Sequence, residues 1–339
     1  MIVNLPYKIM VEKRLDENVR EFLLSLKLGK KCAIICDKNV MELCDDTINT
    51  IKRHFSADII SPSLEKTYLE NLSKKISGYD FCIGLGGGRS IDAAKYSSFL
   101  AKIPWIAFPT ILSHDGVVSS RASIESNGAK ISINAAEPIA IIAGLEKIRN
   151  APYRWIAAGA GDLISKISAV EDWRLAAKAG KEPYHTVMAE LSLLSARAVM
   201  SNADDIRKKN YHGLEVLLWA LISSGFAMNI YGSSRPGSGS EHNFSHALEK
   251  LGSSALHGEQ VALGTIATTY LQGQDWKAII KMLKKLKLPV TAKGMGETEE
   301  RVVKALATAS SIRDRYTVLN KKNLTEKSAR NVLESVGII

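Results

Sequence analysis

The sequence has few cysteines and few aromatic residues. Its 339 residues include 4 cysteines, all before residue 83 and without C-x-x-C spacing. They do not form a disulfide framework, and we expect buried thiols in a reducing compartment. Aromatic residues make up 6% of the chain, and no basic stretch alternates with stacking aromatics. Nucleic acid is therefore not an expected partner.

Long apolar runs are also missing. The N-terminal segment has no uninterrupted apolar stretch before its charges, so no signal peptide is expected. Residues 216–234 lack charge, but continuous apolarity extends only over 216–222. A membrane-spanning helix needs about 20 predominantly apolar residues. We therefore expect a buried core helix, no membrane insertion and a cytoplasmic protein.

The remaining composition is that of a soluble globular protein, with 46% hydrophobic and 24% charged residues. Lys and Arg outnumber Asp and Glu by 45 to 35, which gives a formal net charge of +10. Such a balance is compatible with nucleic acid, a membrane surface or small anionic substrates. Because the lysines are spread along the chain, solvated faces explain most of the excess.

Strand-like runs alternate with helical patterns over the first half of the chain. The runs are Lys31–Asp37, Ala57–Ser63, Phe81–Gly84, Trp105–Pro109 and Ile139–Ala143. Strands separated by helical stretches of ten to fifteen residues indicate βαβ units and a parallel sheet. Asn127-Gly128, between residues 121–126 and 130–134, predicts a hairpin because both residues tolerate positive φ.

Helical spacing dominates the second half. Alanine and leucine recur every three or four residues over 163–177, 189–200 and 215–228. We therefore predict two domains. Residues 1–150 form an α/β Rossmann-like domain that binds a dinucleotide, and residues 151–339 form an all-α domain that binds a metal ion and the substrate.

A glycine-rich segment follows the third predicted strand and enters an alanine-rich helix. Its candidate ligand-binding residues are Gly86, Gly87, Gly88, Ser90, Ile91 and Asp92. Glycines let the backbone approach a pyrophosphate, and N–H groups at the helix start point at the anion. A tight turn without a ligand is the alternative. Asp37, at the end of the first strand, either bonds an adenosine ribose or is a plain turn carboxylate.

Three segments of the helical half carry candidate metal ligands. Asp162 precedes one helical stretch, His242 and His246 are four residues apart, and His257 follows a glycine-serine break. Imidazole and carboxylate groups suit Zn²⁺, and a catalytic zinc has three protein ligands and an open position. An H-x-x-x-H pair is also common on a polar helix face. We favour a metal site because three of the seven histidines fall within sixteen positions.

These motifs together resemble the sn-glycerol-1-phosphate dehydrogenase family. The resemblance lies in GLGGGRSIDAAK, FPTILSHDGVVSSRASI, GAGDLISK, SRPGSGSEHNFSHALE and LHGEQVALGT, between about residues 30 and 270. The chain after about residue 275 adds nothing specific. The family belongs with dehydroquinate synthase, glycerol dehydrogenase and the iron-dependent alcohol dehydrogenases, which implies a dehydroquinate synthase-like fold. It also implies NAD(P)-linked interconversion of dihydroxyacetone phosphate and sn-glycerol 1-phosphate, for archaeal-type ether phospholipids.

The resemblance also assigns roles to residues. It implies zinc ligands at Asp162, His242 and His257, and substrate contacts from Asp115, Asp162 and His246, with Asp115 and His246 able to relay the proton. The implied cofactor contacts are Asp37 at the adenosine ribose, Gly86, Gly87, Gly88, Ser90, Ile91 and Asp92 at the pyrophosphate, and Thr110, Ser113 and Ser119 at the nicotinamide.

Several points stay open at this level. Lys166 and Arg235 are candidates for the substrate phosphate, with surface solvation as the alternative. An acid at the ribose favours NAD over NADP, but nearby lysines such as Lys38 can offset it. Three rival functions remain. They are a glycerol dehydrogenase, a dehydroquinate-synthase-like lyase, and a non-catalytic nucleotide-binding or nucleic-acid-associated protein, which the net charge suggests. We expect a homo-oligomer of undetermined size.

Overall fold

The structure, a computed structural model, describes residues 3–15 and 17–339 except the side chain of Ala129. It divides into two compact units, each described by itself. Unit 1 comprises Met1–Leu112 and Gly116–Ala151, and unit 2 comprises Ser113–Asp115 and Pro152–Ile339. The short segment 113–115 therefore belongs with the helical half, although it lies far from that half in sequence.

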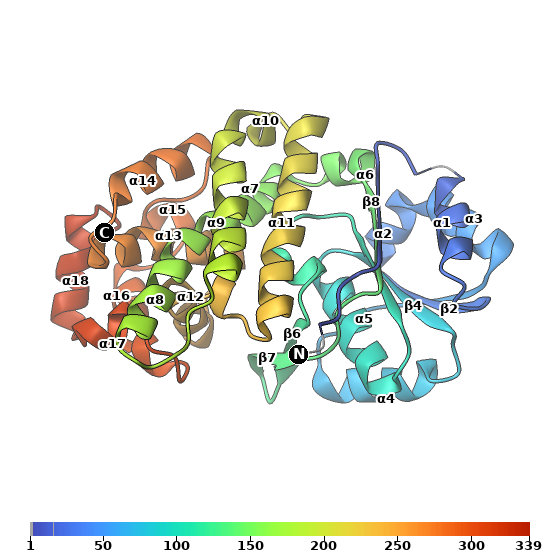
Figure 1. The fold of residues 1–339 in the computed structure, drawn as a ribbon, viewed down its shortest axis with the longest axis horizontal. Coiled ribbons are helices and arrows are strands. Elements are labelled where there is room, and N and C mark those ends of the chain that lie inside the picture. Colours follow the sequence, from blue (N-terminus) through green and yellow to red (C-terminus); the bar gives the residue numbers. More distant parts are fainter. Residues whose placement is uncertain (1–2, 16) are drawn as a thin grey trace. The chain divides into compact units, whose positions relative to one another are not determined.

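Unit 1 is built around a six-stranded parallel sheet with the order β1-β8-β5-β4-β2-β3 (Figure 1). Its strands are β1 (Lys8–Glu12), β2 (Lys31–Ile35), β3 (Ser56–Ile60), β4 (Phe81–Gly86), β5 (Trp105–Pro109) and β8 (Ala140–Gly144). All residues of β4, β5 and β8 are buried, as expected for parallel strands covered on both faces. β6 (Arg121–Ser126) and β7 (Ala129–Asn134) form the predicted antiparallel hairpin.

Helices cover both faces of this sheet. They are α1 (Asn18–Ser25), α2 (Lys38–Leu43), α3 (Asp45–His54), α4 (Lys66–Ile76), α5 (Gly88–Ala101) and α6 (Leu145–Asn150). Figure 1 shows α4 and α5 on one side and α1, α2 and α3 on the other. The chain leaves β2 toward β3 but leaves β4 toward β5. The adjacent carboxyl ends of β2 and β4 therefore lie at a switch point, where open α/β sheets bind ligands.

Unit 2 is helical, apart from short 3₁₀ segments and loops. Its helices are α7 (Tyr153–Ile164), α8 (Lys166–Lys178), α9 (Thr186–Ser201), α10 (Ala203–Arg207), α11 (Tyr211–Tyr231), α12 (Ser240–Lys250), α13 (His257–Leu271), α14 (Trp276–Lys285), α15 (Ala292–Met295), α16 (Glu299–Thr308), α17 (Val318–Lys322) and α18 (Glu326–Ser335). Three 3₁₀ segments are η1 (Asp115–Val117), which crosses from unit 2 into unit 1, η2 (Arg235–Gly237) and η3 (Ala309–Ser311). α11 is long and apolar enough to cross a membrane by length and composition, and 67% of its apolar window is buried within the fold.

Two local features differ from the sequence-based expectation. β1 was not expected, because its short run Lys8–Glu12 carries charges at both ends, yet it completes the sheet beside β8. The continuous helical pattern over 163–177 is interrupted at Ser165, where α7 ends and α8 begins. The Ser165 hydroxyl donates to the Asp162 carbonyl at 2.6 Å. The interruption separates Asp162 and Lys166 onto consecutive helices.

Candidate metal and substrate site

Close packing of α7 against α13 brings two candidate ligands together. Gly161 precedes Asp162, and Gly258 follows His257. A Cβ on Gly258 would lie 1.9 Å from the Ala158 carbonyl oxygen, and a Cβ on Gly161 would lie 2.6 Å from the Gly258 carbonyl oxygen. Only glycine permits this approach of the two backbones. The glycines of the GAGD and LHGE motifs therefore set the spacing of the adjacent side chains.

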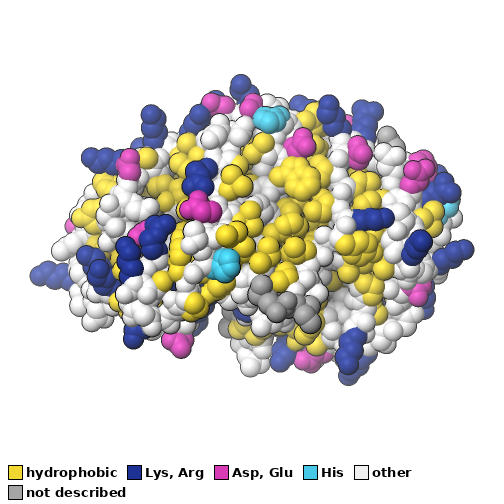
Figure 2. Space-filling model, in the orientation of Figure 1, with side chains coloured by type: hydrophobic (Ala, Val, Ile, Leu, Met, Phe, Trp, Pro, Cys, Tyr) yellow, Lys and Arg dark blue, Asp and Glu magenta, His cyan; other side chains and the backbone are white. Residues whose placement is uncertain are grey.

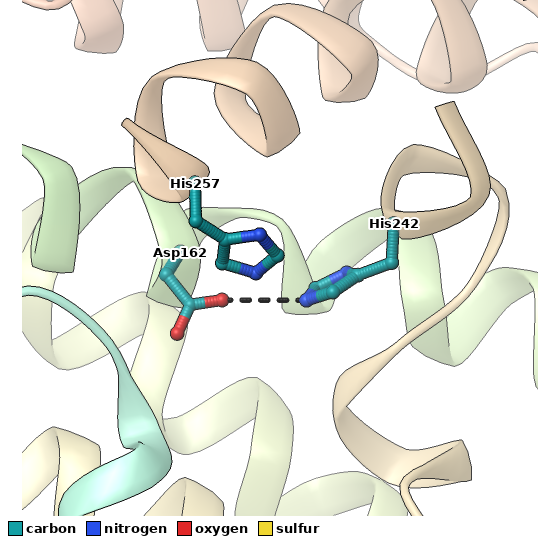
Figure 3. A group of neighbouring side chains, drawn as sticks. All are labelled: Asp162, His242 and His257. Atoms are coloured by element: carbon teal, nitrogen blue, oxygen red, sulfur yellow. Dashed lines mark ion pairs between the residues drawn. The ribbon is translucent and has the colours of Figure 1, made fainter. Parts of the chain in front are cut away.

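Asp162, His242 and His257 converge within unit 2 from α7, α12 and α13 (Figure 3). One ligand atom from each lies within 4.8 Å of the others, and His242 Nε2 is 3.5 Å from Asp162 Oδ1. Two ligands held about 2.1 Å from a tetrahedral Zn²⁺ are about 3.4 Å apart. The donor types and spacing therefore fit a divalent metal ion.

Hydrogen bonds orient both imidazoles of this cluster. His242 Nδ1 donates to Glu241 Oε1 at 2.7 Å. The Ser245 hydroxyl donates to Gln260 Oε1 at 2.8 Å and accepts from His257 Nδ1 at 3.1 Å. Since Nδ1 carries the proton in both rings, each Nε2 has a lone pair for the ion. A hydrogen-bond partner behind each imidazole is the usual support of a metal-binding histidine.

Lys166 balances the acidic charge of the site. Its fully buried ammonium donates to Asp162 Oδ1 at 2.9 Å, to Asp115 Oδ2 at 3.0 Å and to the Gly237 carbonyl at 3.1 Å. Burial opposes the charge of Lys166, but the two carboxylates outweigh it and raise its pKa. Burial would raise the pKa of Asp162, but Lys166, His242 and His257 hold it well below its usual range. The Asp162 carboxylate is therefore ionised, as a metal ligand must be.

The uncharged state of His257 has a separate cause. Burial, reinforced by the neighbouring His242, lowers the pKa of His257 to about 3. Burial also lowers the pKa of His246. The hydrogen bond to Glu249 acts in the opposite direction, and the positive charge of Arg313 lowers the pKa further. The His246 ring centroid lies 6.2 Å from that of His257. His246 thus borders the cluster without belonging to it.

Asp115 joins the site from a distant part of the sequence. Its backbone N–H donates to Asp162 Oδ2 at 3.1 Å, and its Oδ2 accepts from the Ser224 hydroxyl at 2.9 Å. The neighbouring His114 lies 6.5 Å from His257, between ring centroids. Ser224 and His114 were missed by the sequence reasoning, although His114 lies in the motif that contains Asp115.

A second buried carboxylate supports the loop before α12. Asp172 Oδ2 accepts from the Ser240 N–H at 2.7 Å, and its Oδ1 accepts from the Val318 N–H at 2.8 Å. Burial, together with the nearby charge of Glu241, raises the pKa of Asp172 to about 6. Asp172 therefore ties the segment that carries His242 to the start of α17.

Arg235 contacts residues other than the three proposed metal ligands. Its buried guanidinium donates to the carbonyls of Asp172 at 2.9 Å and Tyr316 at 2.8 Å, and its Nε lies 2.7 Å from Glu182 Oε2. These contacts link α8, η2 and the segment before α17. A role for Arg235 or Lys166 at the substrate phosphate stays a prediction.

The glycine-rich segment of unit 1 has the expected local geometry. β4 ends at Gly86, whose φ is +139°, and α5 begins at Gly88. A Cβ on Gly86 would lie 2.8 Å from Ser90 Oγ. That buried hydroxyl has no hydrogen-bond partner among the described residues, which leaves a donor for a ligand.

Other predicted cofactor residues of unit 1 have protein partners. The Asp37 Oδ1 atom lies 2.5 Å from Nη2 of Arg89, the residue that directly follows the three glycines. Asp92 is buried and accepts from the buried Lys95 ammonium at 3.0 Å and from the Ser123 N–H at 3.2 Å. The remaining predicted residues, Ile91, Thr110, Ser113 and Ser119, are buried, with Ser113 assigned to unit 2.

Comparison with known proteins places the chain in a family. Residues 10–152 match iron-containing alcohol dehydrogenase. The whole chain is 40% identical to the glycerol-1-phosphate dehydrogenase [NAD(P)+] of Thermococcus sibiricus, of which it covers 98%. It is 42% identical to the protein of the same name from Sulfurisphaera tokodaii, with 100% of this chain and 98% of that protein covered. The chain belongs to the glycerol-1-phosphate dehydrogenase family.

Solved structures share the fold of this glycerol-1-phosphate dehydrogenase family member. Glycerol dehydrogenase from Schizosaccharomyces pombe has a TM-score of 0.80 and 19% identity, over 99% of this chain and 90% of that chain. A probable glycerol dehydrogenase from Sinorhizobium meliloti has a TM-score of 0.78 and 19% identity, over 99% and 97%. The resemblance and the dehydroquinate synthase-like fold class inferred from the motifs are therefore confirmed.

Proposed function

We propose that this chain is an oxidoreductase that reduces dihydroxyacetone phosphate to sn-glycerol 1-phosphate with NADH or NADPH. The product would supply the glycerol backbone of archaeal-type ether phospholipids. The convergence of Asp162, His242 and His257, with one ligand atom of each within 4.8 Å of the others, carries the proposal. The names of relatives 40% identical over the full chain support the phosphorylated substrate.

Asp162, His242 and His257 would hold Zn²⁺. The ion supplies Lewis-acid polarisation of the substrate carbonyl, and the nicotinamide supplies the hydride. Lys166 keeps Asp162 ionised and pairs with Asp115, and Glu241 and Ser245 fix the tautomers of the two ligating rings. His246, backed by Glu249 at 3.2 Å, or a water on Asp115, relays the proton to the product oxygen.

We assign the pyrophosphate and the adenosine ribose of the dinucleotide to unit 1. The N–H groups at the start of α5 and the unpartnered Ser90 hydroxyl would bind the pyrophosphate. Asp37 would accept from the adenosine ribose, with Thr110, Ser113 and Ser119 at the nicotinamide end. Arg89, paired with Asp37 at 2.5 Å, is the nearby cation that would admit a 2′-phosphate.

The test is NAD(P)H oxidation with dihydroxyacetone phosphate, followed by chiral analysis of the product. We expect turnover, formation of sn-glycerol 1-phosphate, loss of activity with EDTA and recovery with Zn²⁺. A preference for dihydroxyacetone would indicate a glycerol dehydrogenase. Absence of net NADH consumption would indicate a lyase of the dehydroquinate synthase type, or a non-catalytic nucleotide-binding protein.

We further propose a cytoplasmic homo-oligomer that neither inserts into membranes nor binds nucleic acid. Apolar side chains gather over α9 and α11 (Figure 2), where Val187, Leu194 and Trp219 are exposed. Such patches are typical of protein interfaces, and most of the apolar window of α11 is buried within the fold. Sedimentation of the purified chain would test the assembly, and a monomer would contradict it.

A further inference from the structure

The phosphate of the proposed substrate needs a cation, and both residues that the sequence suggests make contacts within the fold. An ammonium has three N–H donors, and Lys166 uses all three on Asp115, Asp162 and the Gly237 carbonyl. Arg235 is turned toward Glu182 and the Asp172 and Tyr316 carbonyls. Lys166 would have to give up a buried contact to receive a phosphate, whereas Nη1 of the buried Arg235 has no hydrogen-bond partner among the described residues.

Arg313 lies beside the helix that carries His242 and His246. Its Nε donates to Asn243 Oδ1 at 2.8 Å, and its Nη2 donates to Ser238 Oγ at 2.9 Å. Asn243 directly follows His242, and His246 is three residues further along α12. The positive charge of Arg313 also contributes to lowering the pKa of His246, after burial. The guanidinium is therefore next to the proposed proton-relay histidine.

The backbone around Arg313 is fixed to the same region. Arg315 Nη1 donates to the Ser238 carbonyl at 2.5 Å, and its Nη2 donates to Ser234 Oγ at 3.0 Å. The Tyr316 carbonyl accepts from Arg235 at 2.8 Å. Because these bonds run to the segment just before α12, Arg313 and the two histidines keep a set separation. Such preorganisation lowers the entropic cost of binding a charged group.

Arg313 also lines a polar cavity of about 390 Å³ in unit 2. The other lining residues are Lys181, Glu182, Ser310, Asp314, Arg315, Tyr316 and Asn320. Hydroxyl, amide and cationic groups predominate, which is the chemistry that binds a small oxyanion. The cavity thus offers polar and cationic groups beside Arg313, together with the carboxylates of Glu182 and Asp314.

We propose that Arg313 binds the phosphate of the substrate and sets the preference for a phosphorylated over an unphosphorylated triose. This inference rests on the proposed function and adds the residue that reads the phosphate. A guanidinium offers planar paired donors that match phosphate oxygens.

The experiment compares Arg313→Gln and Arg313→Lys with the full-length wild-type chain. KM and kcat are measured for dihydroxyacetone phosphate and for dihydroxyacetone, and inorganic phosphate is tested as an inhibitor of dihydroxyacetone reduction. For Arg313→Gln we expect KM for the phosphorylated substrate to rise about 10- to 100-fold. In the same variant, the inhibition constant of phosphate should rise by a similar factor, and KM and kcat for dihydroxyacetone should change little. Arg313→Lys should have an intermediate effect.

Arg197→Gln is the matched control, because Arg197 pairs with Glu190 on an exposed part of α9. Unfolding midpoints and NADH affinity show whether each variant is folded. An unchanged KM for dihydroxyacetone phosphate, or an equal loss with both substrates, would overturn the assignment of Arg313. A wild-type chain that does not prefer the phosphorylated substrate would instead overturn the proposed function.

Discussion

The candidate site of unit 1 is formed mainly by backbone groups, whereas the candidate site of unit 2 is formed by side chains. In unit 1 the proposed pyrophosphate site is one contiguous segment, and its main feature is backbone shape at Gly86 and the start of α5. In unit 2 the proposed metal site draws Asp115, Asp162, His242 and His257 from four segments. A backbone site is visible in a short motif, whereas a side-chain site depends on partners that only the fold supplies.

Loss of a metal ligand should have the largest effect. In His242→Ala we expect bound zinc to be lost and turnover to fall about 1000-fold or more, because Lewis-acid polarisation supplies several kcal/mol. Metal content and NADH oxidation are measured on the same preparations. His54→Ala, an exposed change in α3, is the control. Full activity in the His242 variant would show that the proposed metal site is not needed for turnover.

Removal of the buried ammonium tests the charge balance of unit 2. Lys166→Met leaves the Asp162 and Asp115 carboxyl groups without their ammonium partner. This should lower the free energy of unfolding by about 3–5 kcal/mol. Urea unfolding in the presence of EDTA measures this effect, and Lys178→Met, an exposed change on α8, provides the control. Adding Asp115→Asn to Lys166→Met should recover part of the loss. An unchanged free energy of unfolding in Lys166→Met would contradict the stabilising role of Lys166 beside Asp162 and Asp115.

Asp172 predicts a pH dependence specific to unit 2. Its pKa rises from 3.8 to about 6 on burial, so the folded chain holds a proton that the unfolded chain has released. Its contribution to stability is complete below pH 3.8 and is lost as the pH rises toward 6, by about 3 kcal/mol. Urea unfolding between pH 4 and 7 should show that the free energy of unfolding falls less steeply with pH in Asp172→Asn than in the wild type. Parallel slopes for wild type and variant would contradict the prediction.

A methyl group tests the backbone site of unit 1. Gly86→Ala places a Cβ 2.8 Å from Ser90 Oγ at a φ of +139°, so the turn must shift. We expect about a 10-fold weaker affinity for NADH, measured by fluorescence titration, with metal content unchanged. Gly78→Ala is the control, since its Cβ meets no atom within 4 Å. Equal NADH affinity in both variants would show that backbone shape is not decisive.

The smallest expected effect concerns the choice of dinucleotide. Arg89→Gln removes the cation that pairs with Asp37 at 2.5 Å, leaving an unopposed carboxylate near the proposed ribose position. KM for NADPH should rise several-fold while KM for NADH changes little, because only the 2′-phosphate is repelled. An equal change for both dinucleotides would place Arg89 outside ribose recognition.

The sequence predicted much of the fold because its signals are local. Buried strands such as Phe81–Gly86 and the Asn127-Gly128 hairpin follow from short patterns. β1 was missed because a five-residue run acquires its identity only from pairing with β8. The interruption at Ser165 was missed because the apolar spacing continues through it.

The candidate site was predictable only in part. The three proposed metal ligands stand out as residue types in motifs, and the structure brings them together. The bridging role of Lys166 could not be predicted, since Asp115 lies 51 positions away. Arg313 lies beyond the segments that resemble the family, and its contact with Asn243 spans 70 positions. No sequence pattern marks such a long-range hydrogen bond.

The close crossing of α7 and α13 has a consequence for the choice of ion. The separation of the Asp162 and His257 side chains is set by backbone atoms in contact at Gly161 and Gly258, not by flexible rotamers. We therefore expect this helix contact to limit the radius of the ion that the proposed site accepts, through two glycines that are not among the three proposed ligands.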